Sequence, residues 1–235
     1  MKTKNRIWIC HLLVIGLVLI LANNCKKDDN NNPAAIITDI DGNVYTSVAI
    51  GTQVWMTENL KSTKFLNGDL IGTTTPDTLD ISGENEPKYQ WAYDGNESLV
   101  TTYGRLYTWY AATDTRNVCP TGWHVPTDAE WTTLTTFLGG DSVAGGKLKE
   151  TGTTHWSTPN KGATNETGFT ALAAGNRWYW SDATFWGIGY VAMWWSSIGN
   201  SSDYAYFRSM SYDGSSVTRD LPQKDFGFSV RCLKD

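Results

Sequence analysis

The sequence contains few charged residues and few side chains that bind metals. Only 18% of its 235 residues are charged, where about 25% is usual, and 19 Lys and Arg stand against 24 Asp and Glu. The formal net charge of −5 excludes a basic nucleic-acid-binding protein. There are three His and four Cys but no Cys-x-x-Cys pair, so the sequence lacks the ligand spacing of a zinc site.

A long membrane-spanning run is also missing. Residues 7–22 are mostly apolar, but 16 residues interrupted by His11 fall short of the ~20 that a spanning helix needs. The run follows three cations, a pattern typical of an export signal. Cys25 and a charged, Asn-rich stretch come next, and together these features resemble a bacterial lipoprotein signal. We therefore expect a signal peptide at residues 1–24, lipidation of Cys25 and a flexible tether at residues 25–35.

The tether begins CKKDD, which is similar to the surface-export signals of lipoproteins in the Bacteroidota. The resemblance implies a protein anchored by lipid in the outer membrane and exposed on the cell surface. Asn24 departs from the small residue that usually precedes a lipidated Cys, so a plain secretory signal is the alternative. Loss of residues 1–24 removes three cations and no acid, which leaves a formal charge of −8. Such an acidic surface disfavours polyanionic partners.

Two cysteines remain in the body of the chain. In an oxidising compartment Cys119 and Cys232 predict a disulfide, which would add about 4–5 kcal/mol of stability by the loop-entropy model. Cys119 lies five residues before His124, a spacing that could suggest a thiol nucleophile with its base. A disulfide-bonded Cys cannot serve this chemistry, so we predict no catalytic residue.

Turn and cap signals predict a mixed domain over residues 36–235. Asp41-Gly42 lies between two β-prone runs and predicts a hairpin, and Gly51-Thr52 leads into a further strand with Val54 and Met56. Leu106, Trp109 and Tyr110 have helical spacing and predict a short helix with its aromatic side chains in the core.

The clearest helix follows Thr127, the expected N-cap. Glu130 completes a capping box, a periodic apolar face includes Trp131, and Gly139 ends the helix. A short third helix is expected at residues 142–150. Strands at both ends with helices between them indicate the α+β class.

Residues 39–43 resemble a calcium loop only in part. Asp39, Asp41 and Asn43 have alternating acidic spacing, but the glycine comes one position early and no acid closes the loop. We predict no metal site and no cofactor, with calcium left as an alternative that no motif supports.

Eight segments occur in a fixed order: DIDGNVY, IGTQVWMTENL, YGRLYTWYAA, VCPTGWHVPTDAEWTTL, GGKLKETG, NETGFTAL, MWWSS and GFSVRC. They resemble the Fibrobacter succinogenes major paralogous domain family, whose members occur in secreted proteins and lipoproteins and have largely undefined functions. HVPTDAEW and GFSVRC are also similar to segments of formylglycine-generating enzymes. That second resemblance implies a C-type-lectin-like fold with paired terminal strands, two to three short helices and a long irregular loop region. It implies no enzymatic activity, since the thiol pair of those enzymes is absent near the C-terminus.

Tryptophan is abundant, with 12 in the chain. Trp194, Trp195 and the tryptophans of the other family segments are expected in the core. Trp178, Tyr179 and Trp180 fall where the family usually has polar loop residues, and three consecutive aromatics of a strand cannot all point inward. With the nearby Trp186 they are the candidate ligand-binding residues, because aromatic faces suit sugars.

These observations favour a non-enzymatic surface lipoprotein that binds glycan or another extracellular ligand. A structural or adhesive module that binds protein is the first alternative, because the same aromatics could form an apolar patch. An enzyme using carboxylates that the sequence cannot pair is the second. The expected partners are the membrane, through the lipid, and a glycan or an extracellular protein, and no nucleic acid.

Overall fold

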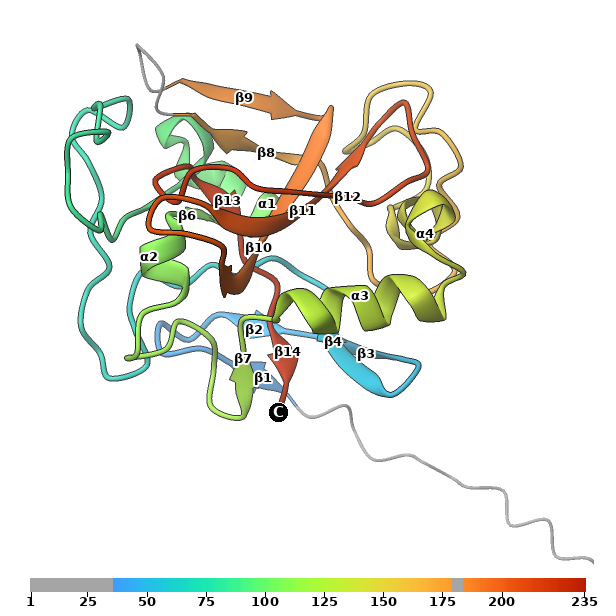
Figure 1. Ribbon diagram of the computed structural model, residues 1–235, viewed down its shortest axis with the longest axis horizontal. Helices are drawn as coiled ribbons and strands as arrows, with labels where there is room; N and C mark the ends of the chain where they lie inside the picture. The colour runs from blue at the N-terminus through green and yellow to red at the C-terminus, as the bar shows by residue number, and fades with distance from the viewer. Residues whose placement is uncertain (1–35, 179–183) are drawn as a thin grey trace, which may run out of the picture. The chain divides into compact units, whose positions relative to one another are not determined.

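The computed structural model describes residues 36–178 and 184–235 (Figure 1). The expected signal peptide, the lipidated Cys25, the tether, Tyr179 and Trp180 therefore lie outside the described residues. Short helices and strands are joined by long irregular segments, which places the domain in the α+β class, as the sequence predicted.

Three antiparallel or mixed sheets organise the described residues. The first pairs β1 (Ile37–Thr38) with β2 (Val44–Tyr45). The second has the order β3 (Ser47–Ile50), β4 (Gln53–Met56), β14 (Leu233–Lys234) and β7 (Trp123–His124).

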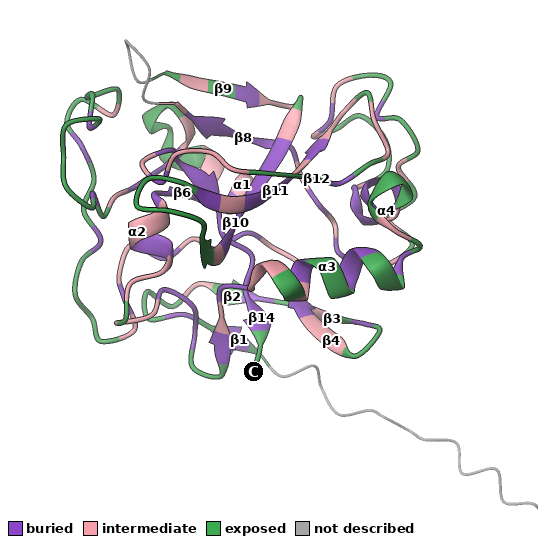
Figure 2. Ribbon diagram, viewed as in Figure 1, coloured by how far each residue is buried: buried purple, intermediate pink, exposed green. Residues whose placement is uncertain are grey.

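The third and largest sheet contains eight strands and has β10 at its centre. One path through it runs β12 (Thr218–Asp220), β11 (Ala205–Ser211), β10 (Val191–Gly199), β13 (Phe228–Ser229), β6 (Leu106–Tyr107) and β5 (Gln90–Trp91). Off this path, β8 (Ala174–Arg177) pairs with β10 and with β9 (Phe185–Ile188). Figure 2 shows β8 and β10 buried and β12 exposed.

Four short α-helices and two 3₁₀ turns lie between the strands of the described residues. The α-helices are α1 (Val100–Tyr103), α2 (Trp109–Ala112), α3 (Asp128–Phe137) and α4 (Asp141–Leu148). The 3₁₀ turns are η1 (Tyr93–Gly95) and η2 (Glu97–Leu99). The expectation of two to three helices was therefore too low by one, because α1 is a single turn without a periodic apolar face.

Most tryptophans of the described residues lie in the core. Trp194 and Trp195 follow each other on β10, so their side chains point to opposite faces, and both are fully buried. Trp195 belongs to one apolar cluster with Phe228, and Trp194 to another with Trp131. The prediction that the family segments supply core tryptophans is confirmed for these residues.

Helix α3 lies between the β3–β4 hairpin and the large sheet (Figure 1). Its Trp131 ring is 4.7 Å from the Trp55 ring on β4 and 6.0 Å from Trp194 on β10. The predicted capping box is present, since the Thr127 hydroxyl accepts from the Glu130 amide at 3.2 Å and the Glu130 carboxylate accepts from the Thr127 amide at 2.7 Å.

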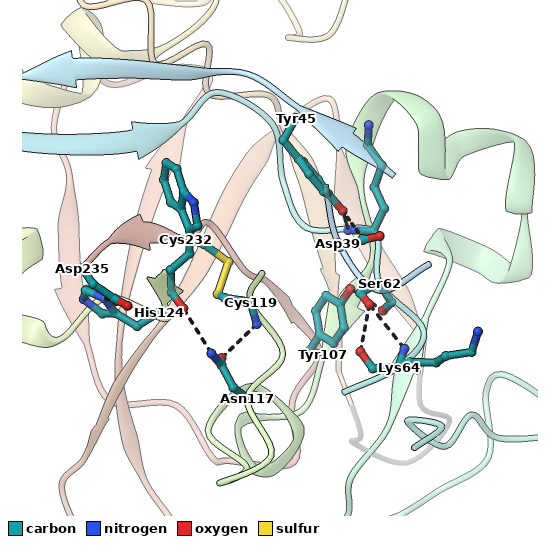
Figure 3. Close-up of a disulfide and its surroundings, with 12 residues drawn as sticks. Asp39, Tyr45, Ser62, Lys64, Tyr107, Asn117, Cys119, His124, Cys232 and Asp235 are labelled. Atoms are coloured by element: carbon teal, nitrogen blue, oxygen red, sulfur yellow. Dashed lines mark hydrogen bonds and ion pairs between the residues drawn. A yellow bond between two sulfur atoms is a disulfide. The ribbon is translucent and has the colours of Figure 1, made fainter. Parts of the chain in front are cut away.

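The predicted disulfide joins Cys119 to Cys232 (Figure 3). It connects the segment before β7 with the segment before β14, and the two cysteines lie 113 positions apart in the sequence. The last strand, β14, pairs with β4 and β7. The expectation of paired terminal strands is thus only partly right, because the first strand, β1, pairs with β2.

The hairpins at Asp41-Gly42 and Gly51-Thr52 are confirmed. The helix predicted around Leu106 is wrong in part, because residues 106–107 form β6 and only residues 109–112 are helical. Pairing of β6 with β5 and β13 overrides the local helical spacing.

Candidate functional site

Trp178 and Trp186 are the two aromatic candidates within the described residues, and Tyr179 and Trp180 lie outside them. Trp178 follows β8, is only partly exposed and packs against the core, with its ring 4.7 Å from the Phe226 ring. Trp186 lies on β9 and is 52% exposed. Of these two described candidates, the structure places Trp186 on the surface and Trp178 at the edge of the core.

Buried Arg177 organises the region beside Trp178. Its Nε and Nη2 atoms donate to the carbonyl oxygens of Asp77 and Leu79 at 2.9 and 2.6 Å, and its guanidinium lies 4.1 Å from the Trp91 ring centroid. Its backbone exchanges two hydrogen bonds with Gly227. Arg177 thus fixes two segments, the loop after residue 76 and the stretch before Gly227, next to each other.

Two cavities adjoin in this region, with volumes of about 280 and 480 Å³. They share Tyr110, Asp203 and Lys224. We call their combined lining the acidic groove; it comprises Ser82, Glu84, Asn85, Glu86, Pro87, Lys88, Trp109, Tyr110, Thr113, Asp114, Thr115, Ser202, Asp203, Gln223, Lys224 and Asp225.

The floor of the acidic groove combines aromatic rings with a buried lysine. The Trp109 and Tyr110 rings meet edge to face at 5.7 Å. The Lys224 ammonium lies 4.1 Å from the Trp109 ring centroid and donates to the carbonyl oxygens of Ser201 and Ser202 at 2.8 and 3.1 Å. Burial lowers the pKa of Lys224. These contacts fix the Trp109 and Tyr110 rings at the floor of the acidic groove.

Four carboxylates at this floor form no close ion pair among the described residues. None of Glu84, Glu86, Asp203 and Asp225 forms an ion pair with a described residue. The Oδ1 atom of Asp225 is buried and accepts no hydrogen bond from the described residues, and burial raises the pKa of this carboxyl to about 6. The groove therefore offers several acceptors to a ligand that carries hydrogen-bond donors.

Asp114 differs from these acids because its charge is balanced. Its carboxylate accepts from Arg116 at 2.8 Å and pairs with Lys88 at 2.9 Å. The Arg116 side chain holds the pKa of Asp114 well below its usual range. This part of the groove wall is structural.

Cys119 and His124 both contact residues near the C-terminal end of the sequence. Cys119 is in the disulfide. The His124 ring lies between Asp235, at 2.7 Å from Nδ1, and Glu130, at 3.1 Å from Nε2 (Figure 3 labels His124 and Asp235). His124 thus connects the last residue of the chain with the start of α3.

The acidic residues of the first hairpin have structural hydrogen bonds. The Asp39 carboxylate accepts from the amides of Asp41 and Asn43 at 3.0 and 2.9 Å and from the Tyr45 hydroxyl at 2.6 Å, which stabilises the turn. Across residues 36–178 and 184–235, no group of three or more His, Cys, Asp or Glu side chains is arranged to hold a metal ion. The same part of the chain contains no helix that is both long and apolar enough to span a bilayer.

Sequence reasoning missed the acidic groove. Its residues come from separate stretches near positions 82–88, 109–115, 202–203 and 223–225, and no spacing within any one stretch connects them. Tyr110 was expected in the core, whereas the structure leaves it partly exposed in the groove. The charged NEPK stretch at residues 85–88 was the available signal, but it is equally typical of a solvated loop.

The fold is an α+β domain with two apolar clusters and one disulfide. A model of the Fibrobacter succinogenes major domain family matches residues 48–234, so the chain belongs to this family. No curated protein and no solved structure matches the chain. The family assigns no activity to the groove.

Proposed function

We propose that the protein is a non-enzymatic surface lipoprotein that binds an extracellular glycan in the acidic groove. The observation that carries this proposal is the rigid Trp109–Tyr110 pair beside unpaired carboxylates. Sugars present apolar faces that stack on aromatic rings and hydroxyl groups that donate to carboxylates. In this proposal the signal at residues 1–24 exports the chain and lipid on Cys25 anchors it at the outer membrane.

A C-type-lectin-like relationship forms part of the proposal. The mixed sheets, the long irregular segments and the pairing of β14 with β4 near the N-terminus support it. The binding surface of such a domain would then be formed by its irregular segments, which agrees with the origin of the groove residues.

A glycan array tests the binding claim. Wild-type protein is compared with Tyr110→Ala, and Trp186→Ala on β9 is the matched aromatic control. We expect Tyr110→Ala to weaken glycan binding about tenfold, since an aromatic contact contributes roughly 1–1.5 kcal/mol. Trp186→Ala should bind as wild type does. Retention of no glycan by the wild type, or equal binding by Tyr110→Ala, would contradict the proposal.

Protein binding is the second candidate function, and β9 favours it. This strand pairs only with β8 among the described strands, and it presents Trp186 at 52% exposure. An edge strand with an exposed aromatic can add a strand from a partner. Loss of binding in Trp186→Ala but not in Tyr110→Ala would favour this function.

Lipid anchoring is tested separately. Palmitate should be incorporated into the wild-type chain and not into Cys25→Ser. Incorporation that survives in Cys25→Ser would contradict the anchor, whatever the array shows.

A further inference from the structure

Three segments of the family resemblance converge on a second cavity, apart from the acidic groove. Its volume is about 260 Å³. TENL, NETGFTAL and GFSVRC supply all of its lining residues but one: Thr57, Glu58, Asn59, Thr170, Leu172 and Arg231. Thr102, which is exposed on α1, completes the rim. These segments are far apart in the chain, so the cavity brings together residues that no spacing in the sequence connects.

Arg231 is the buried cation of this cavity, with 1% of its surface exposed. It donates twice to Asn59 Oδ1, at 3.0 Å from Nε and 2.8 Å from Nη2. Nη1 donates to the carbonyl oxygens of Met56 and Phe169 at 3.2 and 2.7 Å. A guanidinium has five N–H donors, so one donor on Nη2 has no acceptor among the described residues.

The acceptors of Arg231 are all neutral, which leaves its charge poorly balanced. No carboxylate of the described residues forms an ion pair with it, and burial lowers its pKa to about 9. Glu58 is the acid whose charge opposes this shift, but its carboxylate oxygens accept from the Thr46 amide at 2.9 Å and hydroxyl at 2.8 Å. A buried cation without a paired anion is costly, so an entering anion would be stabilised here.

Thr170 adds strain at the same place. Its φ of 54° lies in the left-handed region, which β-branched residues rarely adopt. The preceding carbonyl, of Phe169, is the one that accepts from Arg231. The strained residue therefore directly follows the carbonyl group that helps to position the Arg231 guanidinium at the cavity.

We infer that this cavity binds the carboxylate of one small hydroxylated acid, such as a uronic acid residue. The free N–H of Arg231 receives the carboxylate, while Glu58 accepts from hydroxyl groups of the ligand at the rim. The volume is below the ~300–1,000 Å³ of sites for drug-sized ligands, so it accommodates a single residue. The site is independent of the acidic groove and of the ligand proposed there.

Nitrogen-15 NMR of the purified chain tests this inference, with sodium glucuronate as the probe and glucose as the neutral match. Glucuronate should shift the Nε resonance of Arg231 and the amides of Thr57 and Thr170 in a saturable manner, and glucose should not. Methyl glucuronide serves as a second probe, because its anomeric position is blocked as in a uronic acid at the end of a glycan chain. Comparison of its shifts with those of glucuronate distinguishes a chain-terminal residue from the free acid. Absence of a saturable shift, or equal shifts with glucose, would overturn the inference.

A pair of variants tests the place of binding without disturbing Arg231. Thr102→Trp puts a bulky side chain at the rim, whereas Thr101→Trp changes an exposed neighbour on α1 that does not line the cavity. We expect Thr102→Trp to weaken glucuronate binding at least about tenfold and Thr101→Trp to leave it unchanged. Equal binding by both variants would place the ligand elsewhere.

Discussion

Single buried side chains carry much of the order in the irregular segments. Lys149 is fully buried, and its ammonium donates to the carbonyl oxygens of Lys161, Ser211 and Gly214 at 3.0, 3.0 and 2.7 Å. It therefore joins the end of α4 to a loop and to the end of β11. The sequence could not show that this lysine is part of the core, because its three acceptors are backbone carbonyls 12, 62 and 65 positions further along the chain.

Lys149→Met tests this role. The change keeps most of the side-chain volume but leaves three partly buried carbonyl groups without the ammonium donor, so we expect a loss of about 2–3 kcal/mol in the free energy of unfolding. Urea denaturation measures it. Lys147→Met is the control, because Lys147 and its partner Glu166 are both exposed and their pair contributes under about 1 kcal/mol. Equal effects of the two variants would contradict the account.

Asp225 predicts a pH dependence of stability. Burial raises its pKa from 3.8 to about 6, so the folded state holds this proton more tightly than the unfolded state. Its contribution to stability is present below pH 3.8 and is lost as the pH rises through 6. Because the side chain is partly exposed, we expect a loss of only about 1–2 kcal/mol across this window.

Asp225→Asn should remove this slope. Urea unfolding at intervals between pH 4 and pH 7 would show the variant gaining stability relative to wild type as the pH rises. Parallel curves for the two proteins would contradict the raised pKa. Other acids, such as Asp114, titrate in both proteins and cancel in the difference.

At the scale of elements, the sequence predicted a helix or strand correctly only where several local signals occur within a few residues of one another. Helix α3 was predictable from its cap, its apolar face and its terminal glycine, because each acts within a few residues. Strand β6 and helix α2 were not predictable in this way. The chain passes from strand to helix between residues 107 and 109, and the pairing of β6 with the distant strands β5 and β13 sets this boundary. The same limit applies to β13 and β14, which lie close together at residues 228–234 but belong to two different sheets.

The cap of α3 gives a prediction of this scale. Thr127→Ala removes the hydroxyl that accepts from the Glu130 amide, so we expect about 1 kcal/mol less stability by thermal or urea unfolding. Thr133→Ala is the control, because Thr133 is exposed in the middle of α3 and its loss should change stability by under about 0.5 kcal/mol. A cap variant as stable as the control would show that packing of Trp131 alone fixes the helix.

At the scale of the whole molecule, the disulfide and the family segments hold distant parts together. The two cysteines were predictable as a pair because no other pairing exists in the body of the chain. The acidic groove and the Arg231 cavity were not predictable, since each is assembled from stretches that share no spacing. The core tryptophans were predictable from the family segments, and the structure buries Trp55, Trp91, Trp123, Trp131, Trp194 and Trp195.

Removal of the disulfide tests its contribution. The double variant Cys119→Ala/Cys232→Ala opens a loop of 113 positions, for which the entropy model predicts a loss of about 4–5 kcal/mol. Guanidinium unfolding of the oxidised wild type and of the variant measures the difference. Equal stabilities would show that the unfolded chain gains little freedom when the bond is absent.

The central claim, that the acidic groove binds the glycan, is tested most directly by mapping backbone amide shifts when a glycan retained on the array is added. The account predicts shifts at residues 84–88, at Tyr110, at residues 202–203 and at residues 223–225, with little change on β9. Shifts confined to β9 around Trp186, with the groove residues unchanged, would contradict it.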